Sequence, residues 1–248
     1  MLLDTHKKEG VFYVRLSNEA KLNAISQQMV DEFVYLVEKI NGDPSIKVVV
    51  IKGCPKAFSV GVDINEFDNV TENKIFGLVN QDWECVSAIK VPVISQISGF
   101  ALGGGFELAL MTDIIIADES AKFGFPEINL GLMPGNGGTQ RLLNLIGKSR
   151  AMSLLLTGEL IDANTALQYG IISAKVSSDK LENTVDSLAQ KISEKSYFSL
   201  VKIKECVSGL ENDRLSAGIK LEKSNFRSLF FTSESEKSIK AFLSKKKS

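Results

Sequence analysis

The run IKVVVI at residues 46–51 is the feature that most constrains how this chain can fold. Nearly all of its residues are β-branched, which is typical of a strand buried on both faces of a parallel sheet. Such a strand needs a layer of structure above it and another below it. Further strands are expected at residues 11–16, 91–97 and 114–117, and helices at residues 27–40, 75–89, 103–111 and 140–146. This alternation predicts an α/β fold in which helices pack on sheets.

Helix signals are clearest after Ser26, which can cap the N-terminus of a helix. The apolar residues that follow are spaced three or four apart on one helical face: Met29, Phe33, Leu36, Val37 and Ile40. From about residue 179 the strand signals stop, and helices are expected at 181–192, 196–210, 214–231 and 233–247. We therefore divide the chain into a core, residues 1–195, and a helical C-terminal segment, residues 196–248. The apolar faces of this segment should pack on the core or on a neighbouring subunit.

The composition disfavours several classes of protein. A formal net charge of -1 gives no basic excess for nucleic acid or a membrane surface, and three lysines at 245–247 are expected to be solvated. No stretch approaches the roughly 20 apolar residues of a membrane span. The first ten residues also lack the apolar segment of a secretory signal. We therefore expect a cytoplasmic protein that uses neither nucleic acid nor a membrane as its partner.

The chain has few cysteines and histidines, which limits the metal sites and disulfides that it can form. The three cysteines, at 54, 85 and 206, have no CxxC spacing, so reduced thiols are expected and a disulfide framework or a structural zinc is not. His6 is the single histidine and lies in a polar stretch, so a solvated side chain is expected there. Asp113 and Asp118 flank a strand, where capping of the strand ends is favoured over metal binding.

Glycines are concentrated in the middle of the chain. Nine of the 19 lie between residues 99 and 138, where an even spread would place about three. Tight turns can explain single glycines, but the cluster favours close approach of the backbone to a ligand. The first group, GFALGGGFE at 99–107, follows a strand and opens a helix, whose N-terminal N–H groups can bind an oxyanion. It matches neither the GxGxxG motif nor the Walker A motif of nucleotide-binding proteins.

The second group comprises FGFPE at 123–127 and GLMPGNGG at 131–138, and its last glycines again precede a helical stretch. Each group has a carboxylate close by, Glu107 in the first and Glu127 in the second. Glu107 lies among apolar neighbours, where burial should raise the pKa of its carboxyl and make it a candidate acid or base. Two carboxyls in one pocket can divide the two roles between them. Whether they meet does not follow from their spacing.

Several of these motifs together resemble the crotonase superfamily, and most of all its enoyl-CoA hydratases. The resemblance rests on KAFSVGVDINEF at 56–67, GFALGGGFE at 99–107, FGFPE at 123–127, PGNGGTQR at 134–141, LTG at 156–158, ANTALQYG at 163–170 and AFLSKKK at 241–247. It runs in one register over nearly the whole chain. It implies a crotonase-like spiral of ββα units forming two nearly perpendicular sheets, with a C-terminal helical segment that trimerises, often into a hexamer.

The resemblance also implies roles for individual residues. The backbone N–H groups of Val62 and Gly104 would form an oxyanion hole for the thioester oxygen of an acyl-CoA substrate. Glu107 and Glu127 would be the catalytic acid and base, and the N–H of Gly135 would help to hold the water. Asp63 and Ile64 would lie near the adenine of CoA, and Lys56 and Lys245 would contact its phosphates, although solvated lysines are an equal alternative.

The implied reaction is hydration of a 2-enoyl-CoA thioester to a 3-hydroxyacyl-CoA, in fatty-acid oxidation or a related acyl-CoA pathway. It uses no metal and no separate cofactor, because coenzyme A is part of the substrate. Two alternatives stay open: a double-bond isomerase or other acyl-CoA enzyme of the superfamily, and a non-catalytic or RNA-binding protein that kept the fold. The pair Glu107 and Glu127 favours hydration, since isomerases of this superfamily can work with one carboxyl at the position of Glu127.

Overall fold

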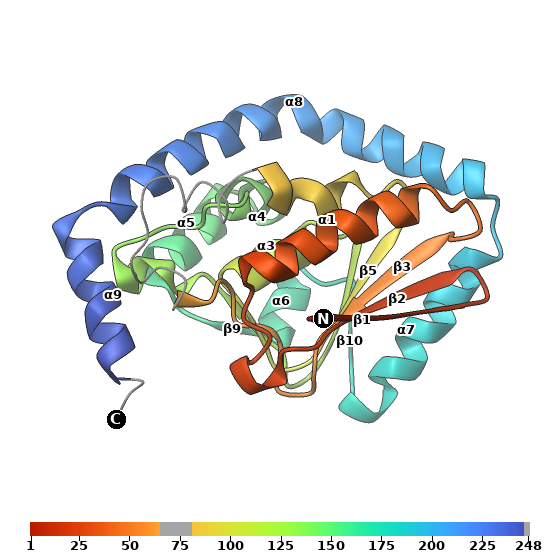
Figure 1. Cartoon of the computed structure of the whole chain (residues 1–248), viewed down its shortest axis with the longest axis horizontal. Helices are drawn as coiled ribbons and strands as arrows, with labels where there is room; N and C mark the ends of the chain where they lie inside the picture. The colour runs from red at the N-terminus through yellow and green to blue at the C-terminus, as the bar shows by residue number, and fades with distance from the viewer. Residues whose placement is uncertain (65–80, 246–248) are drawn as a thin grey trace.

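The computed structural model describes residues 1–64 and 81–245, without the side chains of 81–83, 209–214 and 245 (Figure 1). Its strands form a six-stranded sheet in the order β1-β2-β3-β5-β7-β10 and a four-stranded sheet in the order β4-β6-β8-β9. The strands are β1 (Leu3–Lys8), β2 (Val11–Leu16), β3 (Val48–Lys52), β4 (Ala57–Ser59), β5 (Val93–Ile97), β6 (Phe100–Leu102), β7 (Ile114–Asp118), β8 (Lys122–Gly124), β9 (Ile161–Asp162) and β10 (Ala174–Val176).

Helices surround these sheets and account for most of the remaining described residues. The α-helices are α1 (Gln27–Asn41), α3 (Gly104–Leu110), α4 (Gly138–Ile146), α5 (Lys148–Thr157), α6 (Ala163–Tyr169), α7 (Ser178–Ser193), α8 (Tyr197–Phe230) and α9 (Ser233–Lys245). Short 3-10 helices are η1 (Glu19–Lys21), η3 (Gln81–Ala88) and η4 (Pro126–Leu130). The predicted α/β fold is therefore confirmed. Of the helix expected at 75–89, residues 75–80 lie outside the described part of the chain, and the rest contains η3.

Strand β3 confirms the interpretation of the IKVVVI run. It pairs in parallel with β2 on one side and β5 on the other, at the centre of the larger sheet. Val49 and Ile51 belong to the main core, which includes the buried face of α1, while Val48 and Val50 pack with α7 on the opposite face. The two helices lie on opposite sides of the sheet in Figure 1. Burial on both faces explains why nearly every side chain of this strand is aliphatic.

Helix α1 begins as the sequence predicts. The Ser26 side chain accepts a hydrogen bond from the N–H of Met29, and the helix buries the expected apolar residues (Met29, Phe33, Leu36, Val37 and Ile40). Its last residues are followed by Gly42, as the Asn-Gly-Asp-Pro turn requires. The other expected elements that are described lie within about three residues of their predicted bounds.

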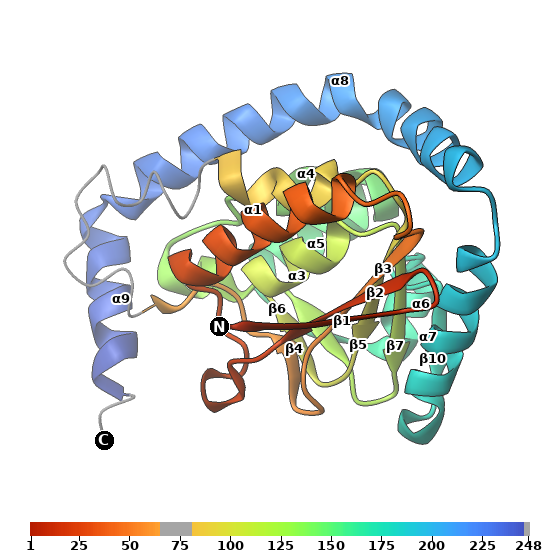
Figure 2. The same ribbon diagram turned by 45° about the vertical axis from the view of Figure 1, so that its right-hand side comes forward.

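Several elements differ from the prediction. Those that were not expected include the short strands β4, β6, β8, β9 and β10 and the helices α5 and α6. Residues 3–8 form the edge strand β1, antiparallel to β2, although they are mostly polar, because only Leu3 faces the core and an edge strand can expose the rest. The helices expected at 196–210 and 214–231 form one helix, α8, of 34 residues. The polar residues between them include no proline, so nothing there interrupts the helical hydrogen bonds. Figure 2 shows α8 arching over the core to α9.

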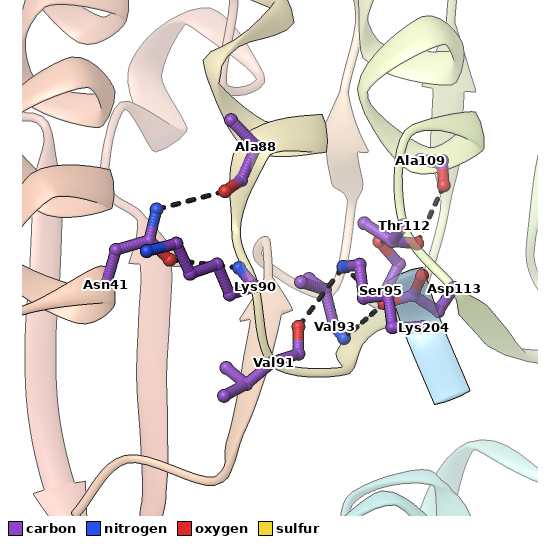
Figure 3. A network of polar contacts seen from close by, with 10 residues as sticks. All are labelled: Asn41, Ala88, Lys90, Val91, Val93, Ser95, Ala109, Thr112, Asp113 and Lys204. Carbon is purple, nitrogen blue, oxygen red and sulfur yellow. Dashed lines mark hydrogen bonds and ion pairs between the residues drawn. The ribbon is translucent and has the colours of Figure 1, made fainter. Parts of the chain in front are cut away.

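A polar network anchors the first part of α8 to the larger sheet (Figure 3). Lys204 donates from Nζ to a carboxylate oxygen of Asp113 at 2.7 Å and to the carbonyl oxygen of Val91 at 3.1 Å. The same Asp113 carboxylate accepts from the N–H of Val93 at 2.7 Å, where β5 begins. Asp118 likewise accepts from Ser120 after β7, so both aspartates cap strand ends as expected. Among the described residues, no helix is long and apolar enough to cross a membrane.

Candidate active site

Helix α3 begins directly after β6, a strand of the four-stranded sheet. Strand β6 ends at Leu102, and Gly103 turns the chain with a φ of 53°, in the left-handed region that favours glycine. The N–H of Gly104 then lies in the first turn of α3, where backbone donors have no partner within the helix.

A second backbone donor lies beside it, from a distant part of the sequence. Gly61 precedes Val62 with a φ of 91°, and a Cβ on Gly61 would lie 3.0 Å from the nitrogen of Gly104. A Cβ on Gly104 would in turn lie 3.5 Å from the nitrogen of Val62. The two glycines therefore allow two backbone segments to come together, with the N–H groups of Val62 and Gly104 as neighbours. Paired donors of this kind can stabilise an oxyanion.

A cavity of about 670 Å³ opens beside these donors. Its lining includes seven of the nine residues predicted from the sequence: Val62, Asp63, Ile64, Gly104, Glu107, Glu127 and Gly135. Lys56 is exposed, before β4, and is not part of this lining. Lys245 ends α9, and its side chain lies outside the described residues.

Glu107 lies on α3 and is only 2% exposed. Its Oε1 accepts hydrogen bonds from the N–H groups of Asn136 at 2.7 Å and Gly138 at 2.9 Å. Burial raises the pKa of its carboxyl well above the usual value, and the nearby charges of Glu222 and Glu127 add to the rise, while the two N–H donors oppose it. Gly138 has to be a glycine, because a Cβ there would lie 2.9 Å from this same oxygen and 2.8 Å from Phe125.

Glu127 lies on η4, directly after strand β8 and Phe125. Its Oε2 is buried and has no hydrogen-bond partner among the described residues. Burial raises the pKa of this carboxyl to about 8, with a smaller contribution from the charge of Glu222. A Cβ on Gly103 would lie 2.9 Å from Glu127 Oε1, so the carboxyl packs against the bare backbone at the start of α3. One cavity thus contains two carboxyls of raised pKa, a combination suited to proton transfer.

Asp63 has a partner that the sequence analysis did not find. It is 5% exposed, and its carboxylate accepts from Lys21 Nζ at 2.7 Å. Lys21 also lines the cavity. Nothing in the sequence marks this lysine, because it comes from a short 3-10 helix 42 residues away.

The C-terminal helices contribute the other residues that were missed. Phe226 of α8 and Phe242 of α9 line the cavity, and Phe226 packs in a small apolar cluster with Leu132. Glu222 of α8 is 2% exposed and hydrogen-bonds the start of α4. A signal for Glu222 does exist in the sequence, since it lies three residues after Ile219 and four before Phe226, on the apolar face of the helix.

The remaining chemistry-bearing residues lie elsewhere. His6 of β1 stacks on the ring of Tyr13 with centroids 4.4 Å apart. Among the described residues, no group of three or more His, Cys, Asp or Glu side chains could hold a metal ion.

Comparison with known proteins identifies the chain's relatives. The family model for enoyl-CoA hydratase/isomerase matches residues 6–248. A probable enoyl-CoA hydratase of Mycobacterium leprae is 37% identical, over 99% of this chain and 95% of its own. A probable mitochondrial enoyl-CoA hydratase of Dictyostelium discoideum is 39% identical, over 98% of this chain and 88% of its own.

Solved structures agree with this result. The crystal structure of an enoyl-CoA hydratase subunit from Geobacillus kaustophilus matches with a TM-score of 0.82 at 38% identity, covering 99% of this chain and 96% of that one. The predicted crotonase-like fold is thereby confirmed. The family model and these relatives match this chain almost from end to end. The chain therefore belongs to the enoyl-CoA hydratase/isomerase family.

Proposed function

We propose that this protein hydrates 2-enoyl-CoA thioesters to 3-hydroxyacyl-CoA. The observation that carries the proposal is the meeting of Glu107 and Glu127 in one cavity beside the paired N–H groups of Val62 and Gly104. Hydration needs a base that takes a proton from the attacking water and an acid that gives a proton to C2. This cavity offers one carboxyl for each role. The names of the relatives support the same reaction class.

The oxyanion hole accounts for activation of the substrate. Attack of water at C3 moves electron density from the C2=C3 bond toward the thioester oxygen. With that oxygen held by the N–H groups of Val62 and Gly104, the growing negative charge meets two fixed donors. Removing one donor from a site of this kind typically costs about 3–4 kcal/mol of transition-state stabilisation.

The two carboxyls divide the proton transfers. Burial raises the pKa of both carboxyls, but Glu107 accepts hydrogen bonds from two backbone N–H groups that oppose the rise, whereas Glu127 Oε2 has no partner among the described residues. We therefore assign the ionised role to Glu107, which takes a proton from the attacking water. Glu127, with a pKa of about 8, is protonated near neutral pH and gives its proton to C2. The oxygen of water forms a bond to C3, the double bond becomes single, and one proton enters at C2. The N–H of Gly135 helps to hold the water.

Binding of the CoA portion is assigned to the mouth of the cavity. Asp63, fixed by its ion pair with Lys21, and Ile64 lie near the adenine in this proposal. Lys56 and Lys245 contact phosphates, the latter from the end of α9. No cofactor other than the CoA of the substrate takes part.

The proposal includes an oligomeric state and a cellular compartment for this protein. We assign residues 1–195 to the catalytic core and residues 196–248 to assembly into a homotrimer or a hexamer. Large apolar side chains exposed on the described part of α8 support a subunit contact there: Phe198, Ile203, Val207 and Leu221. Cys54 and Cys206 are thiols, which is typical of a reducing compartment, and we place the protein in the cytoplasm.

The test is the ultraviolet absorbance of crotonyl-CoA and longer 2-enoyl-CoAs, which falls when the conjugated double bond is hydrated. We expect rapid loss of absorbance with the wild-type protein, and a fall in kcat of at least about 100-fold in Glu107→Gln and Glu127→Gln. The matched control is Glu205→Gln, the same change at an exposed glutamate, which should leave kcat unchanged.

Two results would contradict the proposal. The hydratase assignment is wrong if the wild-type protein leaves every enoyl-CoA untouched. Conversion of a 3-enoyl-CoA into the conjugated 2-enoyl isomer, without hydration, would instead make the protein a double-bond isomerase.

A further inference from the structure

Glu222 is a third carboxylate close to the candidate active site, and the proposed reaction does not use it. It comes from the C-terminal half of α8, far along the chain from Glu107 and Glu127. It is 2% exposed. Burying a carboxylate so completely is costly unless hydrogen bonds compensate for the lost water.

These hydrogen bonds all go to the start of α4. Glu222 Oε2 accepts from the N–H of Thr139 at 2.7 Å and from the Thr139 hydroxyl. Glu222 Oε1 accepts from the N–H of Gly137. The residue at the N-cap of α4 is Gly137, which has no side chain to cap the helix, so a glutamate from another helix supplies the cap.

The segment held in this way is the one that contacts Glu107. The N–H groups of residues 137 and 139 bind Glu222, while those of Asn136 and Gly138 bind Glu107 Oε1. Successive N–H groups of one turn thus alternate between two carboxylates. Gly135, the proposed water-holding residue, directly precedes this turn.

We propose that Glu222 is a positioning residue that fixes the turn at residues 135–139, and through it the orientation and protonation of Glu107. The inference rests on the proposed function, because it assigns Glu222 a part in the same reaction. Glu222 itself does not line the cavity and is not a catalytic residue.

The charge of Glu222 affects the pKa of the two carboxyls in the cavity. Glu107 faces Glu222 from α3 and Glu127 from η4, and the charge of Glu222 raises the pKa of both carboxyls. Burial raises the pKa of Glu222 itself, while the hydrogen bonds from Thr139 and Gly137 and the charge of Arg141 on α4 oppose that rise. The Arg141 guanidinium also pairs with Glu84 of η3 at 2.7 Å. A negative charge at Glu222 therefore makes Glu107 harder to ionise.

The experiment is the pH profile of kcat for the full-length protein with crotonyl-CoA, in wild type, Glu222→Gln, Glu222→Asp and Glu205→Gln. Glutamine keeps the shape of Glu222 but removes its charge and one of its two acceptors. For Glu222→Gln we expect kcat to fall about ten- to a hundredfold with little change in KM. The acid limb of the pH profile is the fall in kcat at low pH, where Glu107 becomes protonated. In Glu222→Gln we expect this acid limb to move about one pH unit lower.

Aspartate keeps the charge, so the acid limb of Glu222→Asp should stay near that of the wild type. Glu205 lies on the same helix but is exposed and pairs with Lys202, so Glu205→Gln should match the wild type in both readouts. A helix cap with a merely structural role would lower kcat or stability without moving the acid limb.

The position of the acid limb decides the outcome. A limb that does not move in Glu222→Gln overturns the inference while leaving the proposed function intact; a wild-type protein without hydratase activity overturns both. If Glu222→Gln does not fold, Thr139→Val is measured in its place. It removes the hydroxyl that lowers the pKa of Glu222, so Glu222 loses its charge at a higher pH and the limb should again move lower.

Discussion

Replacing Glu127 with glutamine should stabilise the folded protein at alkaline pH. The pKa of this carboxyl is raised from its ordinary value of 4.5 to about 8 by burial. The folded protein therefore keeps a proton on Glu127 that the unfolded chain releases. Between these two pH values the unfolded chain becomes increasingly favoured as the pH rises.

The size of the effect follows from the shift. Each pKa unit corresponds to about 1.36 kcal/mol, so a rise from 4.5 to about 8 corresponds to about 5 kcal/mol. The sign is that of a carboxyl whose pKa is raised in the folded state. Its contribution to stability is fully present below pH 4.5 and is lost as the pH rises to about 8. Glutamine does not ionise, so the variant escapes this loss.

Urea unfolding followed by circular dichroism measures the difference. Wild type, Glu127→Gln and Glu205→Gln are compared at about pH 5, 7 and 9, across the window set by the two pKa values. The advantage of Glu127→Gln over wild type should grow by several kcal/mol from the lowest pH to the highest, up to about 5 kcal/mol. Glu205→Gln should follow the wild type. Parallel stability curves for wild type and Glu127→Gln would refute a raised pKa at Glu127.

Three further substitutions test other parts of the structure. Gly103→Ala puts a methyl group 2.9 Å from Glu127 Oε1 at a φ of 53°, so kcat for crotonyl-CoA should fall about 100-fold; activity near wild type would show that this contact does not hold the carboxyl. Lys204→Met leaves the Asp113 carboxylate without its cation, and urea unfolding should show a loss of about 2 kcal/mol, which an unchanged midpoint would contradict. Ser26→Ala removes the N-cap of α1 and should cost about 1 kcal/mol by the same measurement; no loss would argue against that cap.

The layers of the fold could be predicted because they depend on local patterns. The aliphatic run of β3 and the three-and-four spacing of α1 each reflect burial of one element against its neighbours. The edge strand β1 could not be predicted in this way, because its polar residues are held by backbone pairing with β2 and carry no apolar alternation. The unbroken length of α8 was not predicted, because the apolar residues on either side of Glu-Asn-Asp at 211–213 show two helical faces but do not show whether the backbone continues between them.

The candidate site was predictable where sequence motifs are continuous. Glu107, Glu127 and the glycines around them lie in short motifs, so the resemblance could place them, and the structure brings both carboxyls to one cavity. Contacts between distant segments do not form continuous motifs; the spacing of Glu222 on the apolar face of its helix indicates that it points inward but does not identify its partners. Lys21 and Glu222 reach the site from elements far away in sequence, and their partners follow only from the tertiary fold.

Hydration is the central claim, and labelled water tests it most directly. The protein is incubated with crotonyl-CoA in water enriched in oxygen-18, and the product is analysed by mass spectrometry. The account predicts a 3-hydroxyacyl-CoA with one oxygen-18 atom in its hydroxyl group, formed by wild type and by Glu205→Gln and strongly reduced in Glu107→Gln and Glu127→Gln. Turnover of the enoyl-CoA without incorporation of oxygen-18 at C3, or no turnover at all, would contradict it.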